Sequence, residues 1–228
     1  MAWTGSHPRL LARSRAGAGR LRRPGGVALL AVGLLLIAEA AVTMLWQEPL
    51  TALWTRGEQK KLAAELDRSA PLGDGTLPML ARALERRAQE GDPLGRVVIP
   101  GIGVKFVFVQ GTATSNLKKG PGHYLDTELP GMRGTVGIAG HRTTYLAPFR
   151  KIDDLKPGDP VELRMPYGNF TYTVAGAKIV SPRDVSVLRH RSGDWLVLTA
   201  CHPLYSNAKR IVVSARLTGS APTRPAPS

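Results

Sequence analysis

Hydrophobic and polar residues follow two different rhythms along the chain, and the change between them predicts its organisation. Residues 27–46 form one uninterrupted apolar run, VALLAVGLLLIAEAAVTMLW, whose only charged residue is Glu39. A helix needs about 20 such residues to cross the hydrocarbon core of a bilayer. From Arg96 onward the apolar residues come instead in short β-rich runs, bounded by Gly, Pro and Asn.

The short runs predict a mainly β fold, an eight-stranded β-barrel that is closed or nearly closed. Pro166-Tyr167-Gly168-Asn169 predicts a hairpin between two of the strands. The expected strands are 96–99, 104–109, 135–139, 161–164, 170–174 with its extension 178–180, 195–199 and 211–217.

Residues 47–93, between the apolar run and the first strand, have helical spacing. Leucines recur there at four-residue intervals with charged residues between them. We expect two helices, 50–68 and 76–90, that form a stalk, although the second helix could also pack on the domain.

The expected organisation has five parts. The barrel is assigned to residues 94–217, and the tail from 218 to 228 is too poor in apolar residues to pack, so we expect it to be disordered. The parts that precede the barrel are a basic arm at 1–26, a transmembrane anchor at 27–46 and the stalk at 47–93.

Charge orients the anchor. The net charge is +14, and six arginines lie in residues 1–26 without any Asp or Glu. The positive-inside rule places the N-terminus in the cytoplasm and the barrel outside the cell membrane. Ala38-Glu39-Ala40 leaves a cleaved signal peptide open as an alternative. A nucleic-acid partner is not expected, because the sequence has neither a zinc knuckle nor a dense basic helix.

Three residues at predicted strand ends carry candidate chemistry. Cys201, the only cysteine, stands where a strand gives way to a loop, and His141 follows another strand. Arg210 comes nine residues after Cys201, so a tight loop between antiparallel strands would bring its guanidinium back beside the sulfur. A nearby cation favours the nucleophilic thiolate and can stabilise an oxyanion, while a histidine can move protons.

Each of these residues alone has a plainer interpretation, as a small buried cysteine, a loop histidine or a solvated arginine. Their occurrence together, in this order and at strand ends, favours the catalytic interpretation. A metal site built on His141, Cys201 and His202 lacks a fourth ligand at usable spacing, and no cofactor is expected.

Three segments resemble the motifs of sortases, and most of all those of actinobacterial class E sortases. They are LKKGPGHY (117–124), AGHRTTYLAPFRKIDDLKPGD (139–159) and LTACHPLYSNAKRIVV (198–213). The resemblance implies an eight-stranded barrel and a cysteine transpeptidase. Its partners would be secreted proteins with a C-terminal Leu-Ala-x-Thr-Gly or Leu-Pro-x-Thr-Gly sorting signal, and a peptidoglycan-precursor amine. It implies that Cys201 is the nucleophile, His141 the acid/base and Arg210 the oxyanion or substrate clamp.

The resemblance also suggests substrate contacts. The family usually has Thr immediately before the catalytic Cys, where this sequence has Ala200, and Thr199 is a candidate to compensate. Tyr124 could contact the second position of the signal, and Ser206 could shape the groove.

Two other functions stay open at this point. One is a membrane-tethered, sortase-like adaptor that binds tails or wall polymer without turnover. The other is a pilin-polymerising sortase, against which Asp92-Pro93-Leu94 argues weakly because it lacks the aromatic residue of the inhibitory lid motif of such enzymes.

Overall fold

The structure is a computed structural model that describes residues 24–46, 49–69, 72 and 74–223. The chain divides into two compact units, one ending at Ala41 and the other beginning at Val42. Helix α1 (Pro24–Trp46) extends the predicted apolar segment by three residues at its start, and Gly25–Val42 is long and apolar enough to cross a membrane. Most of the predicted basic arm lies outside the described residues.

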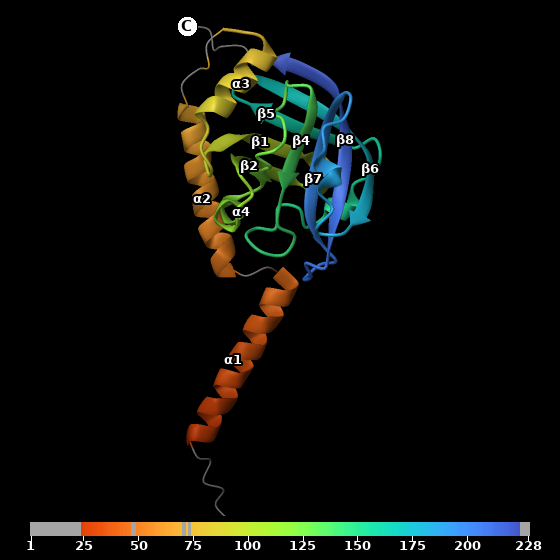
Figure 1. The fold of residues 1–228 in the computed structure, drawn as a ribbon. Coiled ribbons are helices and arrows are strands. Elements are labelled where there is room, and N and C mark those ends of the chain that lie inside the picture. The colour runs from red at the N-terminus through yellow and green to blue at the C-terminus, as the bar shows by residue number, and fades with distance from the viewer. Residues whose placement is uncertain (1–23, 47–48, 70–71, 73, 224–228) are drawn as a thin grey trace, which may run out of the picture. The chain divides into compact units, whose positions relative to one another are not determined.

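Eight strands close into a barrel, which confirms the predicted fold (Figure 1). Around the barrel the order is β1-β2-β3-β4-β7-β8-β6-β5, with parallel pairing at β2–β3 and β4–β7 and antiparallel pairing elsewhere. The strands are β1 (Pro93–Ile99), β2 (Val104–Gln110), β3 (Gly122–His123), β4 (Gly134–Ala139), β5 (Pro160–Met165), β6 (Gly168–Val180), β7 (Asp194–His202) and β8 (Lys209–Pro222).

Alternation along the strands builds the core, because successive side chains point to opposite faces of a sheet. On β7, Leu196, Leu198 and Ala200 belong to the central core, whereas Val197 joins a small outer cluster with Val187 and Val212. Three short 3-10 helices lie between strands: η1 (Pro100–Ile102), η2 (Ile152–Asp154) and η3 (Val185–Leu188).

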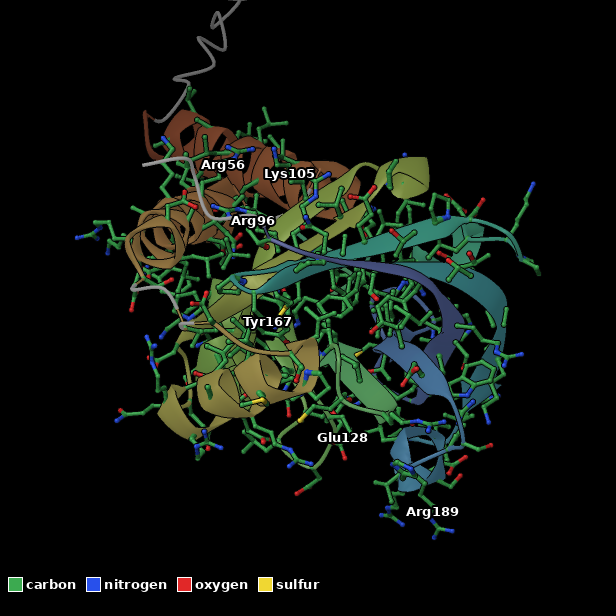
Figure 2. The ribbon with its side chains drawn as sticks, turned by 90° about the horizontal axis from the view of Figure 1, so that it is seen from above. Arg56, Arg96, Lys105, Glu128, Tyr167 and Arg189 are labelled. Atoms are coloured by element: carbon green, nitrogen blue, oxygen red, sulfur yellow. The ribbon has the colours of Figure 1, made fainter. Side chains whose placement is uncertain are left out.

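The hairpin between β5 and β6 is confirmed. Met165 pairs with Gly168, so Pro166 and Tyr167 form a two-residue turn. The Tyr167 hydroxyl donates a hydrogen bond of 2.6 Å to the Pro130 carbonyl, and the Tyr167 side chain, labelled in Figure 2, is buried. Sequence analysis did not predict β3 or helix α4 (Thr114–Lys119), because both are too short to show a period.

Both helices predicted as a stalk pack on the barrel in the structure, which the sequence analysis had allowed for the second helix alone. Helix α2 (Pro49–Arg68) packs Leu62 and Leu66 against Val107 and Val109 of β2. Gln59 also exchanges hydrogen bonds with the backbone of Val107, at 2.8 Å from its nitrogen and 2.9 Å from its oxygen. These contacts hold α2 alongside β1 and β2 (Figure 1).

Helix α3 (Leu77–Arg87) contributes side chains to the central core of the barrel. Its Ala81 and Leu84 are part of the central core. The expected start of the domain at residue 94 therefore omits side chains that the core needs. Four-residue spacing reveals an apolar face, but it does not tell whether that face is covered by the chain itself.

The tail prediction is corrected as well. Strand β8 continues through Thr218 to Pro222, and residues 219–222 pair with 168–171 of β6. Backbone hydrogen bonds to a neighbouring strand order this segment although its side chains are mostly exposed. Residues 224–228 of the predicted tail lie outside the described part of the chain.

Candidate active site

Parallel strands β4 and β7 bring His141 and Cys201 to the same end of the barrel. Ala139 pairs with Thr199, and the Gly140 amide donates a hydrogen bond of 3.0 Å to the Thr199 carbonyl. His141 lies two residues beyond Ala139, and Cys201 lies two residues beyond Thr199. Since neighbouring strands are about 4.8 Å apart, His141, just beyond the end of β4, and Cys201, near the end of β7, lie at the same end of two adjacent strands.

Antiparallel pairing of β7 with β8 adds the third residue. Cys201 pairs directly with Arg210, and directly opposed residues project from the same face of a sheet. Cys201 therefore stands between the end of β4, which carries His141, and the start of β8, which carries Arg210. The spacing of nine residues along the chain pointed to this juxtaposition.

Thr199 and Ala200 point in opposite directions. Ala200 is 3% exposed and packs in the central core, on the face of β7 opposite to Cys201. Thr199 shares the outer face with Cys201, and its hydroxyl lies 2.8 Å from the Tyr124 hydroxyl. Ala200, also predicted as a substrate-binding residue, thus has its methyl on the face of β7 away from Cys201. Thr199 and Tyr124 stay candidates.

Gly137 allows Tyr124 to reach Thr199. A Cβ atom at Gly137 would lie 2.9 Å from Leu188 and 3.0 Å from the Tyr124 ring. Contacts this short do not occur without displacement of a neighbour, so the missing side chain lets both residues lie directly over β4. Leu188 belongs to η3, and the outer face beside Cys201 is therefore bordered by η3 and Tyr124.

His141 has a neutral, partly shielded imidazole. Burial, and then the positive charge of Lys118, lower the pKa of His141 below its ordinary value. Its Nε2 atom is buried and has no hydrogen-bond partner within the described residues. The Tyr145 ring lies 5.2 Å from the imidazole, and Tyr145 in turn meets the Trp54 ring at 6.4 Å. A neutral imidazole with an unoccupied nitrogen is able to accept a proton.

The loop after His141 has an unusual backbone. Tyr145, Leu146 and Ala147 have φ angles of 52°, 62° and 41°, in the left-handed region that favours glycine. Each such residue costs about 1–3 kcal/mol, so the rest of the structure must hold the loop in place. Phe149 contributes to this, because it is fully buried and its amide donates to the His141 carbonyl at 2.9 Å.

Ser206 lies in the loop between β7 and β8, and Arg210 is the second residue of β8. Arg210 Nη1 donates to the carbonyls of Asn207 and Lys209, both at 3.1 Å. In the part of the chain that the structure describes, Nε and Nη2 of Arg210 have no hydrogen bond and can serve an incoming oxygen. Ser206 accepts a hydrogen bond of 3.2 Å from the Ala208 amide, so its hydroxyl shapes the loop itself.

A family model for the sortase domain matches residues 97–218, which is more than half of the chain. The chain belongs to the sortase family. It is 33% identical over 148 residues to Sortase D of Bacillus subtilis, covering 64% of this chain and 73% of that relative. As a member of this family it is a sortase-type transpeptidase.

Solved sortase structures agree with the fold. The Sortase D5 transpeptidase of Clostridium perfringens is 26% identical with a TM-score of 0.62, over 72% of this chain and 99% of that one. Sortase E1 of Streptomyces coelicolor, solved with a tripeptide in its active site, is 29% identical with a TM-score of 0.56, over 58% and 91%. Both class D and class E sortases are thus similar to this chain.

Two buried polar residues near the sortase site have no role in the sequence analysis. Arg142 follows His141 directly and is 2% exposed, and His123 precedes Tyr124 and is 1% exposed. Their position next to candidate residues was the available signal. Their burial could not be foreseen from residue type, because arginine is mostly exposed in proteins and histidine is intermediate.

Proposed function

We propose that this sortase cleaves the Thr–Gly bond of a C-terminal sorting signal on secreted proteins and transfers the acyl group to a cell-wall amine. The observation that carries the proposal is the meeting of His141, Cys201 and Arg210 at one end of the barrel. Cys201 is the nucleophile, His141 moves protons and Arg210 stabilises the oxyanion. These are the residue types that thiol-based acyl transfer needs.

The first half-reaction forms a thioester. His141, neutral near pH 7, takes the proton of the Cys201 thiol, and the sulfur attacks the carbonyl carbon of the signal's threonine. Negative charge then develops on the carbonyl oxygen, which Nε and Nη2 of Arg210 can meet as hydrogen-bond donors. The C–N bond breaks, His141 gives its proton to the departing glycine amine, and the acyl group stays on Cys201.

The second half-reaction releases the product. An amine of a cell-wall precursor attacks the thioester carbon and loses a proton to His141. The C–S bond breaks, and the sulfur of Cys201 recovers a proton from the imidazole. The products are a new amide bond and the original enzyme, so no further reactant is needed.

The outer face of β4 and β7 is the proposed place for the signal. Tyr124 and Thr199, joined by their hydroxyls at 2.8 Å, lie next to Cys201 on this face. A phenol can hydrogen-bond a peptide that lacks proline, which suits a Leu-Ala-x-Thr-Gly signal and a class E assignment. The Leu-Pro-x-Thr-Gly signal is the second candidate and is tested beside the first.

We also propose a single-pass membrane protein with its catalytic unit outside the cell. The apolar helix α1 supports the anchor, and the arginines before it support a cytoplasmic N-terminus. The catalytic unit begins with α2 at Pro49 and continues to the end of β8 at Pro222, because both helices after the anchor pack on the barrel.

Cleavage of quenched fluorescent peptides tests the proposal. The full chain in mild detergent is offered either signal, beside the variants Cys201→Ala, His141→Asn and Arg210→Lys. We expect Thr–Gly cleavage that disappears in Cys201→Ala and falls roughly 10²–10³-fold in Arg210→Lys. Arg216→Lys is the matched control, since Arg216 lies on the same strand and face but pairs with Trp195.

Two outcomes would overturn the proposal. Equal loss in Arg216→Lys and Arg210→Lys would show that Arg210 has no special part in the reaction. Absence of cleavage with both peptides and no acyl adduct on Cys201, in folded protein, would point to an adaptor that only binds tails or wall polymer.

A further inference from the structure

Arg142 is a buried arginine between the loop that follows His141 and strand β7, which carries Cys201. Its side chain is 1% exposed, whereas the side chain of its partner Asp153 is 44% exposed. Burial of a guanidinium is costly unless its donors are paired. The residue follows His141 directly, so whatever holds its guanidinium also restrains the backbone of the candidate acid/base.

One side of the Arg142 guanidinium closes the histidine loop. Nη2 donates to the Asp153 carboxylate at 2.6 Å and to the Arg150 carbonyl at 3.2 Å, and Nε reaches the same carbonyl at 3.4 Å. Asp153 and Arg150 lie eleven and eight residues further along the chain. These bonds tie the far end of the loop to the residue next to His141.

The other side reaches the strand of the nucleophile. Nη1 of Arg142 lies 3.4 Å from the Cys201 carbonyl oxygen and 3.3 Å from Nδ1 of His202. Because a guanidinium can only donate, Nδ1 of His202 must act as the acceptor. One planar group thus touches both the loop of His141 and the backbone of Cys201.

We propose that Arg142 is a positioning residue that sets the placement of His141 relative to Cys201, with Asp153 as its orienting counter-charge. The inference rests on the proposed function, because it concerns the same two residues. The positioning role requires a guanidinium, because one of its nitrogens donates to the strand that carries Cys201 while another donates to Asp153. A lysine keeps the charge but has a single nitrogen, which cannot serve both sides.

The consequence for the reaction is large because proton transfer between His141 and the sulfur depends on short distances. A misplacement of about 1 Å can cost on the order of 10²-fold in rate. The proposed binding of the signal relies instead on Tyr124 and Thr199, and neither has a hydrogen bond to Arg142 in the described structure. Loss of the guanidinium should therefore act on kcat more than on KM.

The test uses the full chain in mild detergent and the variants Arg142→Lys and Arg96→Lys. Arg96 is the matched control, because it also makes an ion pair, at 2.7 Å with Asp67. This pair joins β1 and α2, whereas Cys201 is on β7. We expect Arg142→Lys to lower kcat about 10–100-fold with KM changed by less than about threefold, and Arg96→Lys to keep kcat. A kcat of Arg142→Lys within twofold of the parent, in folded protein, overturns the inference.

A second variant and a second readout keep the inference testable if Arg142→Lys folds poorly. Asp153→Asn leaves an acceptor but removes the counter-charge from a half-exposed position, and we expect a smaller fall in kcat, about 3–10-fold. In the double variant the losses should not multiply, because both changes act on one group. Multiplying losses, or an unchanged kcat in Asp153→Asn, would contradict the proposed role of Asp153.

Alkylation of Cys201 by iodoacetamide separates this inference from the proposed function. If the parent cleaves neither peptide, the proposed function fails, yet the alkylation rate still reports the surroundings of the thiol. We expect slower alkylation in Arg142→Lys than in the parent and in Arg96→Lys. Equal alkylation rates in all three proteins would count against positioning by Arg142, whatever the peptides show.

Discussion

Acid should destabilise this protein through one buried histidine. Burial lowers the pKa of His123 to about 4, and a hydrogen bond to the Glu128 carbonyl offsets only part of this effect. This carbonyl oxygen lies 3.0 Å from Nε2 of His123 and can only accept a hydrogen bond. On the other side of the ring, Oε1 of Gln110 lies 2.9 Å from Nδ1.

The size of the effect follows from the pKa in the folded and the unfolded chain. Between the ordinary value of 6.5 and about 4, the unfolded chain binds the extra proton and the folded one does not. The free energy of unfolding therefore falls as pH decreases through this window. At about 1.4 kcal/mol per pH unit, the loss from His123 approaches 3 kcal/mol near pH 4.

Denaturation in urea at several pH values between 7 and 4 measures this loss, with His123→Gln removing the titrating group. The variant should be the less stable protein at pH 7, because it loses buried hydrogen bonds. The gap in unfolding free energy between parent and variant should then narrow by about 2–3 kcal/mol toward pH 4. His190→Gln, at an exposed position, is the matched control.

A gap that stays constant from pH 7 to pH 4 would refute the reasoning, as would the same narrowing in His190→Gln. Titration of the imidazole signals by NMR gives an independent check. A His123 signal that titrates above pH 6 would contradict the burial argument directly.

Three further predictions follow from the same structure. Lys118→Met removes a positive charge that lowers the pKa of His141, so this pKa should rise in the variant. The acid limb of the kcat/KM profile should then move to higher pH. An unmoved acid limb, or an equal shift in the control Lys119→Met, would contradict this prediction. Tyr167→Phe should lower the free energy of unfolding by about 1–2 kcal/mol, measured in urea, because the buried Pro130 carbonyl loses its donor. A chain that begins at residue 91 should be at least about 3 kcal/mol less stable than one that begins at residue 49, since it lacks Leu84 and Ala81 of the core; equal unfolding temperatures would contradict this.

Local patterns were enough for the strands other than β3 and for the placement of Cys201 beside Arg210. The runs at 104–109 and 135–139 alternate or carry β-branched residues and have glycines at or near both ends, and these signals act over a few neighbours. Cys201 and Arg210 were predicted to meet because a short loop between consecutive antiparallel strands leaves few alternatives. His141 needed the resemblance to sortases, since its partner strand lies far along the chain.

Contacts between distant segments were beyond local patterns. The apolar faces of α2 and α3 are compatible with a separate stalk and with helices packed on the barrel. Only the positions of β2 and of the central core show that these faces pack on the barrel. The same holds for the end of β8, which is ordered by pairing with β6.

By itself the sequence determined an apolar helix followed by a β-barrel, and a thiol, an imidazole and a guanidinium at strand ends. These depend on residue type and on spacing over one turn or one strand. The tertiary structure alone decided which face of each helix is buried, that His123 is enclosed and neutral, and that Arg142 bridges the His141 loop and the Cys201 strand. The reason is that burial and hydrogen-bond partners come from segments far apart in the chain, and no local pattern encodes them.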